Sequence, residues 1–207
     1  MLICSSRNDY EDLLNLLNEK NGATEIADRK KFAARAFNTT SHYDTAIFNW
    51  FNLEEETPVF KQSIQTNRSL RYGENPHQHG VFYGELNELL EQLHGKELSY
   101  NNLVDVDAAM ELIREFDEPT FAVIKHTNAC GVASDNDLKE AWKKALAGDP
   151  VSAFGGVIIT NRKIDAATAA LVNELFLEIL IAPGYDSDAL EILKSKKNRM
   201  ILIQKKN

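Results

Sequence analysis

The sequence has few cysteines, no long apolar run and no excess of positive charge. Its two cysteines, Cys4 and Cys130, are too few for a disulfide framework, and neither belongs to a Cys-x-x-Cys motif. No apolar stretch approaches the roughly 20 residues that a membrane-spanning helix needs. The net charge of −8, with both signs interspersed, argues against nucleic acid as a partner. These absences predict a cytoplasmic protein with reduced thiols that binds neither membrane nor nucleic acid.

The composition is that of an ordinary globular protein, with 43% hydrophobic and 26% charged residues. Short apolar runs alternate with helical patterns in the second half of the chain, and continuous rather than alternating runs are typical of strands buried on both faces. We therefore predict the α/β class, with a mainly parallel sheet flanked by helices. The strands are expected at 80–83, 121–124, 157–160, 177–182 and 200–204.

The first 60 residues have a different pattern from the rest. Leu2–Cys4 is expected to form a short strand, followed by a helix capped at Asn8 or Asp9. Apolar residues at a period near 3.6 predict either one long helix over 28–51 or two helices with a bend near 38–41. A polar connector then indicates a domain boundary near Phe60, which divides the chain into 1–60 and 61–207.

Helices are also expected in the second half of the chain. Their predicted spans are 86–93, a helix starting at Asp105 or Asp107, 138–147 ending before Gly148, one starting near Asp165, and a short helix capped by Ser187 or Asp188.

The segment Leu70–Gln78, Leu-Arg-Tyr-Gly-Glu-Asn-Pro-His-Gln, is the most informative motif. It places a guanidinium, a phenol, an amide and an imidazole within nine residues, a combination suited to an anionic or aromatic ligand. The alternative is a surface turn at Gly73 and Asn75-Pro76 with incidental polar neighbours.

Three further blocks follow the first: Gly-Lys-Glu-Leu-Ser-Tyr-Asn-Asn-Leu at 95–103, Ile-Lys-His-Thr-Asn-Ala-Cys-Gly-Val-Ala at 124–133, and Asp-Pro-Val-Ser-Ala-Phe-Gly-Gly-Val at 149–157. The four blocks in this order resemble the N-terminal part of the transformylase region in the bifunctional AICAR transformylase/IMP cyclohydrolase family. The resemblance runs through essentially the whole chain.

The resemblance implies a specific domain organisation. Residues 1–60 look like the helical tail of an α/β cyclohydrolase domain, and 61–207 look like the first transformylase unit, with a cytidine-deaminase-like fold. The chain would then be a fragment of a longer homodimeric enzyme, in which a second related unit completes the site. The implied reaction transfers a formyl group from 10-formyltetrahydrofolate to AICAR, and the product is cyclised to IMP.

Lys125 and His126 are the expected catalytic pair. They follow the apolar run 121–124, at the carboxyl end of a strand, where parallel α/β sheets bind ligands. Adjacent strand residues point to opposite faces, so both side chains reach one ligand only if the backbone turns at or just after Lys125. By resemblance, His126 is the general base and Lys125 stabilises the developing oxyanion. The alternative is a solvated lysine beside a structural histidine.

Other roles are carried over by position. His77 is expected to be an auxiliary catalytic residue, whereas His79 has no counterpart. Paired glycines at 155–156 indicate either close approach to a flat ligand or a bend, and Glu178 either meets the ribose or is a solvated strand-end carboxylate. The residues expected to bind substrate are Arg71, Tyr72, Asn102, Ser152, Phe154, Gly155 and Glu178.

Two rival functions remain open. His126 and Cys130 stand four apart and both can ligate zinc, but the His-x-Glu and Pro-Cys-x-x-Cys signatures of zinc deaminases are missing, so no metal is expected. Walker and dinucleotide fingerprints are missing as well. The stronger rival is a catalytically incomplete fragment that binds nucleotide or dimerises without turnover, exposing an apolar half-interface.

Overall fold

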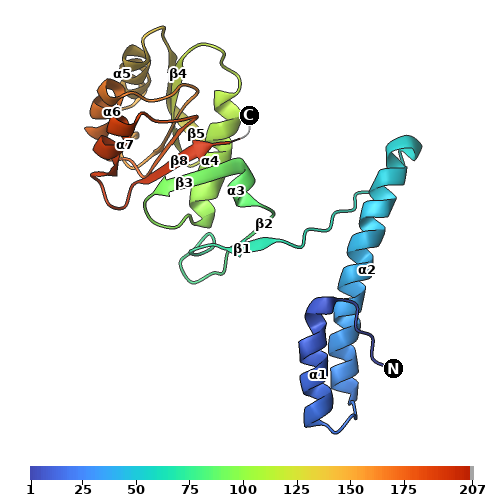
Figure 1. The fold of residues 1–207 in the computed structure, drawn as a ribbon. Coiled ribbons are helices and arrows are strands. Elements are labelled where there is room, and N and C mark those ends of the chain that lie inside the picture. The colour runs from blue at the N-terminus through green and yellow to red at the C-terminus, as the bar shows by residue number, and fades with distance from the viewer. Residues whose placement is uncertain (206–207) are drawn as a thin grey trace. The chain divides into compact units, whose positions relative to one another are not determined.

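The computed structural model describes residues 1–205, which divide into two compact units, Met1–Gln65 and Thr66 onward (Figure 1). The assignment of these units to a cyclohydrolase tail and a transformylase unit stays a prediction.

The first unit is helical. It contains a 3-10 turn η1 (Arg7–Asp9), α1 (Tyr10–Glu19) and α2 (Ile26–Glu55). The predicted strand at Leu2–Cys4 is wrong: this segment has no regular structure, because no strand of this unit lies beside it to pair with its backbone. The 28–51 region is one uninterrupted helix. In its polar stretch the hydroxyls of Thr39 and Thr45 donate to carbonyls one turn earlier, so these side chains find partners within the helix.

The second unit begins with a two-stranded antiparallel sheet. Strand β1 (Asn67–Ser69) pairs with β2 (Val81–Tyr83), so the motif Leu70–Gln78 forms the loop between them. The Leu70 amide bonds the Gly80 carbonyl at 2.9 Å and closes the base of this loop.

The remaining strands of the second unit form one mixed sheet. Among the described residues its order is β3-β8-β7-β6-β4-β5. The strand bounds are β3 (Leu90–His94), β4 (Thr120–Lys125), β5 (Asn128–Ser134), β6 (Val157–Thr160), β7 (Ile179–Ala182) and β8 (Met200–Gln204).

The α/β class is confirmed, but the sheet is mixed rather than mainly parallel. Only the β6–β7 and β7–β8 pairs are parallel, whereas β3–β8, β4–β5 and β4–β6 are antiparallel. Because β4 runs against β6, the carboxyl end of β4 lies beside the amino ends of β6 and β7. The rule that places ligands at the carboxyl ends of parallel strands therefore does not describe this edge.

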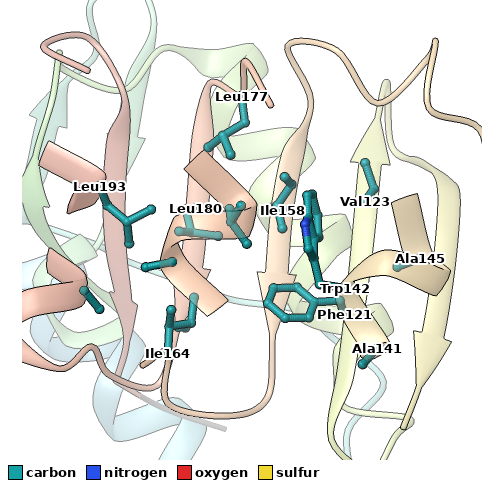
Figure 2. Close-up of a cluster of buried hydrophobic side chains, with 14 of the residues drawn as sticks. Phe121, Val123, Ala141, Trp142, Ala145, Ile158, Ile164, Leu177, Leu180 and Leu193 are labelled. Carbon is teal, nitrogen blue, oxygen red and sulfur yellow. The ribbon is translucent and has the colours of Figure 1, made fainter. Parts of the chain in front are cut away.

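Helices cover both faces of the sheet (Figure 1). Their bounds are α3 (Leu86–Leu89), α4 (Tyr100–Ile113), α5 (Leu138–Gly148), α6 (Ala166–Asn173) and α7 (Ser187–Lys194). The core on the α4 face includes Val106, Ile124 and Ile159. The core on the opposite face is shown in Figure 2, where Phe121 and Trp142 make an edge contact with ring centroids 5.5 Å apart.

Other sequence-based predictions in the second unit also differ from the structure. The predicted helix 86–93 is a single helical turn, α3, that passes into strand β3, which pairs with β8. Helix α4 begins at Tyr100 rather than at Asp105 or Asp107, because Ser99 caps it in a capping box with Asn102. Strand β5 was not expected, since its small and polar residues lack an apolar pattern.

Strand β5 carries a β-bulge. Val123 pairs with Gly131 and Ile124 with Ala129, so Cys130 is the extra residue that has no partner on β4. Beside the bulge, a Cβ on Gly131 would lie 1.9 Å from the Ala145 carbonyl oxygen of α5. The strand and the helix approach each other this closely only because position 131 is glycine.

Candidate active site

Lys125 and His126 lie at the tip of the β4–β5 hairpin. Lys125 pairs with Asn128, and the two residues between them turn the chain, so the backbone turns directly after Lys125. His126 and Thr127 have φ angles of +50° and +62°, the sign that a type I′ turn requires at both central positions. Neither residue is glycine, and each such conformation costs on the order of 1–3 kcal/mol. The imidazole of His126 is thus held on a strained, exposed turn.

The Lys125 side chain connects this turn to the loop before β6. Its Nζ donates to the Phe154 carbonyl oxygen at 2.7 Å. The loop is fixed in turn by the Gly155 amide, which donates to the Phe176 carbonyl at 2.8 Å. The exposed rings of Phe154 and Phe176 lie 4.9 Å apart and inclined by 35°. Lys125 therefore stands beside an aromatic pair that is open to solvent.

The two glycines of this loop have structural explanations. Gly155 adopts a φ of +73°, and a Cβ on Gly156 would lie 3.0 Å from the Ile124 carbonyl oxygen of β4. The first permits a bend and the second permits close packing against the sheet. Ligand contact at Gly155 stays a prediction.

Glu178 is tied into the same edge of the sheet. Its amide donates to the Gly156 carbonyl at 3.1 Å. Its carboxylate accepts from Asn102 Nδ2 at 3.3 Å and lies 3.7 Å from Lys96 Nζ. The carboxylate is therefore held by one hydrogen bond, from Asn102, and by an ion pair with Lys96, so it has partners within the chain.

Asn102 has a structural role at the start of α4. Its Oδ1 accepts from the Ser99 amide at 3.1 Å and from the Ser99 hydroxyl at 3.0 Å, while its Nδ2 points to Glu178. The buried amide thus orients Glu178 and caps a helix. The nucleotide contact predicted for Asn102 has to use the remaining Nδ2 hydrogen.

Arg71 and Tyr72 lie next to the start of α4. The Arg71 amide donates to the Leu98 carbonyl, and the Tyr100 amide donates to the Tyr72 carbonyl, each at 3.2 Å. The Arg71 guanidinium stands 4.7 Å from the centre of the Tyr72 ring and donates to its hydroxyl at 3.0 Å. Within residues 1–205 the exposed guanidinium thus keeps further donors that can bind an anion.

His77 is not brought into contact with these residues. Its side chain is exposed and makes no hydrogen bond within residues 1–205. The loop around it is fixed by Gln78, whose Oε1 accepts from the Asn75 amide at 2.8 Å. An auxiliary catalytic role for His77 stays a prediction.

Three residues at this edge were not singled out from the sequence. They are Lys96 beside Glu178, Phe176 beside Phe154, and Asp105, whose Oδ1 accepts from the Thr127 amide at 2.8 Å. Asp105 follows Asn102 by three residues, so both lie on one face of α4. This spacing could have indicated from the sequence that Asp105 lies beside Asn102. The predicted helix start at Asp105 or Asp107 hides it, because Asn102 then falls outside the helix.

Ser152 donates two hydrogen bonds to the Asp149 carboxylate. Its hydroxyl donates to Asp149 Oδ2 at 2.6 Å and its amide donates to Oδ1 at 2.9 Å. These bonds, the hydroxyl first, hold the pKa of the Asp149 carboxyl below its ordinary value of 3.8. A depressed carboxyl pKa stabilises the fold above the unfolded pKa, and this contribution is lost as the pH falls through the folded value.

Replacing Ser152 should therefore move the titration of Asp149. We expect Ser152→Ala to raise the pKa of Asp149 toward its ordinary value, measured by carboxyl ¹³C NMR between about pH 2 and 6. Asp165 is the internal control, because Thr168 lowers the pKa of that carboxyl in a similar way. An unchanged Asp149 titration would contradict the role given to the Ser152 hydroxyl.

The structure also bears on the zinc alternative. Among residues 1–205, no group of three or more His, Cys, Asp or Glu side chains is arranged to hold a metal ion. Burial raises the pKa of the Cys130 thiol, and the Asp149 carboxylate adds to this effect.

Within residues 1–205, no helix has the length and apolar character needed to cross a membrane.

The chain is similar to known proteins over its full length. A family model described as AICARFT/IMPCHase bienzyme matches residues 1–207. The bifunctional purine biosynthesis protein PurH of Bacteroides thetaiotaomicron is 53% identical over 205 residues, which cover 99% of this chain and 40% of that protein. PurH proteins of Caldicellulosiruptor bescii and Bacillus cereus are each 45% identical, over 94% of this chain and 40% of their own length.

The chain thus spans 40% of the length of these curated relatives. The family model matches residues 1–207 and therefore covers both units of the chain. The chain belongs to the AICARFT/IMPCHase bienzyme family.

Proposed function

We propose that this chain is part of an enzyme of purine biosynthesis that transfers a formyl group from 10-formyltetrahydrofolate to AICAR. One observation carries the proposal: the hairpin turn, the Glu178 carboxylate and the Arg71 segment are all anchored to α4 or to the residues directly before it. A base, a carboxylate and an exposed guanidinium are thereby held along one helix.

The chemistry needs a base and an oxyanion stabiliser close together. The amino nitrogen of AICAR forms a bond to the formyl carbon, and the bond from that carbon to N10 of the folate breaks. His126 takes the proton from the attacking nitrogen, N10 takes up a proton as it leaves, and Lys125 stabilises the negative charge on the formyl oxygen. The exposure of His126 and the single hydrogen bond of Lys125 to a carbonyl support these roles.

The other residues support binding of the substrates. The guanidinium of Arg71 suits the phosphate of the ribotide, with Tyr72 beside it, and Glu178 suits the ribose hydroxyls. The inclined rings of Phe154 and Phe176 offer a surface on which a flat heterocycle can stack.

A second candidate is a binding unit without turnover. The chain covers 40% of its PurH relatives, and the homodimer and second unit implied by the resemblance stay predictions. Two of the groups predicted to bind substrate, the Ser152 hydroxyl and the Asn102 amide, already make hydrogen bonds within the chain. This favours a substrate site that is completed by residues outside this chain. We place the protein in the cytoplasm, because its sequence has only two cysteines, too few for the disulfide framework of a small secreted protein.

One experiment separates the two candidates. We expect the purified chain to bind AICAR in calorimetry, and Arg71→Ala to weaken binding about tenfold or more through loss of a charge-assisted contact. Arg68→Ala, a neighbouring exposed arginine on β1, is the control and should leave binding unchanged. A parallel assay of formyl transfer with 10-formyltetrahydrofolate then decides whether the site is sufficient.

Each outcome has a separate meaning. Turnover supports a complete site within this chain, and binding that depends on Arg71 without turnover supports the incomplete unit. Absence of AICAR binding would contradict both.

A further inference from the structure

We propose that Asp105 is a positioning residue that holds the strained turn bearing His126 in its active conformation. Its catalytic consequence rests on the proposed function, whereas its effect on the turn does not. The proposal starts from the turn itself, in which two non-glycine residues, one of them β-branched, adopt positive φ. Asn-Gly adopts this conformation readily, but His-Thr does not.

Hydrogen bonds within the hairpin stabilise the turn only in part. Thr127 Oγ1 and Asn128 Nδ2 both donate to the His126 carbonyl, at 2.6 and 2.9 Å. These bonds come from residues within or next to the turn, and they move with it. They fix the local shape but not the position of the tip relative to the rest of the second unit.

Asp105 supplies the missing external support. Its Oδ1 accepts from the Thr127 amide at 2.8 Å, and among the described residues it is the side chain outside the hairpin that bonds the backbone of the turn. A carboxylate accepting from a backbone N–H makes a stronger bond than a neutral acceptor. The bond orients the peptide between His126 and Thr127, which is the peptide that must keep its strained geometry.

Helix α4 makes this support rigid. Asp105 directly precedes the buried Val106 and follows the buried Asn102 by three residues, so its backbone is fixed against the sheet. Asn102, one turn earlier on the same face, holds Glu178. The helix therefore sets the position of the His126 turn relative to the carboxylate predicted to meet the ribose.

The turn can be examined directly in the 207-residue chain by NMR. In Asp105→Ala we expect the Thr127 amide to exchange with solvent at least about tenfold faster, since its acceptor is lost. The intraresidue HN–Hα NOEs of His126 and Thr127, which are strong at positive φ because the two hydrogens lie close together, should weaken as the turn averages over other conformations. Asp107→Ala, an exposed aspartate on the same helix, is the matched control and should change neither measurement.

A rescue separates positioning from general stability. Glycine adopts positive φ without strain, so Asp105→Ala combined with Thr127→Gly should restore the strong intraresidue HN–Hα NOE at His126. If Asp105→Ala does not fold, Asp105→Asn carries the test, because it keeps an acceptor oxygen but weakens the bond. Wild-type exchange at Thr127 in the folded variants would overturn the proposal.

Activity adds a second, independent measurement. Where formyl transfer is detectable, Asp105→Ala should lower kcat about tenfold or more while changing the KM for AICAR less than about twofold, because Asp105 touches the turn and not the substrate. Thr127→Gly should recover part of the loss. Changed NMR measurements without turnover in the wild-type chain would favour the binding unit over the complete site and leave the role of Asp105 supported.

Discussion

His126→Ala should lower the rate constant of formyl transfer by at least about 10²-fold, the usual contribution of a positioned general base. The amino group of AICAR is a poor nucleophile because its lone pair is delocalised into the imidazole ring, so removal of its proton matters more than for an ordinary amine. The variant should fold normally, because His126 lies exposed at the tip of a hairpin. This prediction rests on the proposed function, and the measurement is a single-turnover rate in a complete enzyme of the family that carries the sequence of this chain.

The control for this experiment is His79→Ala. His79 is also exposed, lies in the β1–β2 loop and has no assigned role, so its replacement should leave the rate unchanged. A near-normal rate in His126→Ala would remove His126 from the mechanism and return it to the structural alternative. Equal losses in both variants would point to a nonspecific effect.

Gly131→Ala should destabilise the second unit by about 3 kcal/mol or more, at the upper end of the overpacking range. The added Cβ would lie 1.9 Å from the Ala145 carbonyl oxygen, and that atom belongs to the backbone of α5. A flexible side chain could rotate away, but here either the helix or the strand must shift. The measurement is the urea concentration at the unfolding midpoint, followed by Trp142 fluorescence, because this residue lies on the buried face of α5.

Gly184→Ala provides the comparison. A Cβ there would meet Lys163 Cγ at 3.5 Å, an ordinary contact with a mobile side chain, so its midpoint should stay close to that of the wild type. Equal midpoints for both variants would show that α5 yields without penalty, contrary to the close packing described above.

Strand direction was the main feature of the fold that the sequence did not reveal. The apolar runs of β6 and β8 predicted those strands with their observed bounds, because burial on both faces leaves a clear pattern. The β4–β5 hairpin was hidden, since His126-Thr127 lacks the Asn-Gly signal of a two-residue turn. Without that hairpin, β4 could not be recognised as antiparallel to its neighbours.

The motifs predict which segments form the candidate site, but they do not predict the contacts between those segments. The four blocks indicated the segments that meet at this edge, but hydrogen bonds between distant residues, such as Asn102 to Glu178, depend on tertiary packing. Phe176 and Asp105 lie in segments whose local pattern is also that of an ordinary turn or helix. Their significance follows from the neighbours that the fold provides.

The bulge at Cys130 also has a consequence for solubility. Strand β5 is an outer strand of the sheet, and an outer strand presents unpaired amide and carbonyl groups to which another chain can add. The extra residue interrupts the regular spacing of those groups and increases the local twist. A second copy therefore meets a poor template along β5, so the irregularity beside the hairpin that carries His126 also protects the sheet from edge-to-edge aggregation.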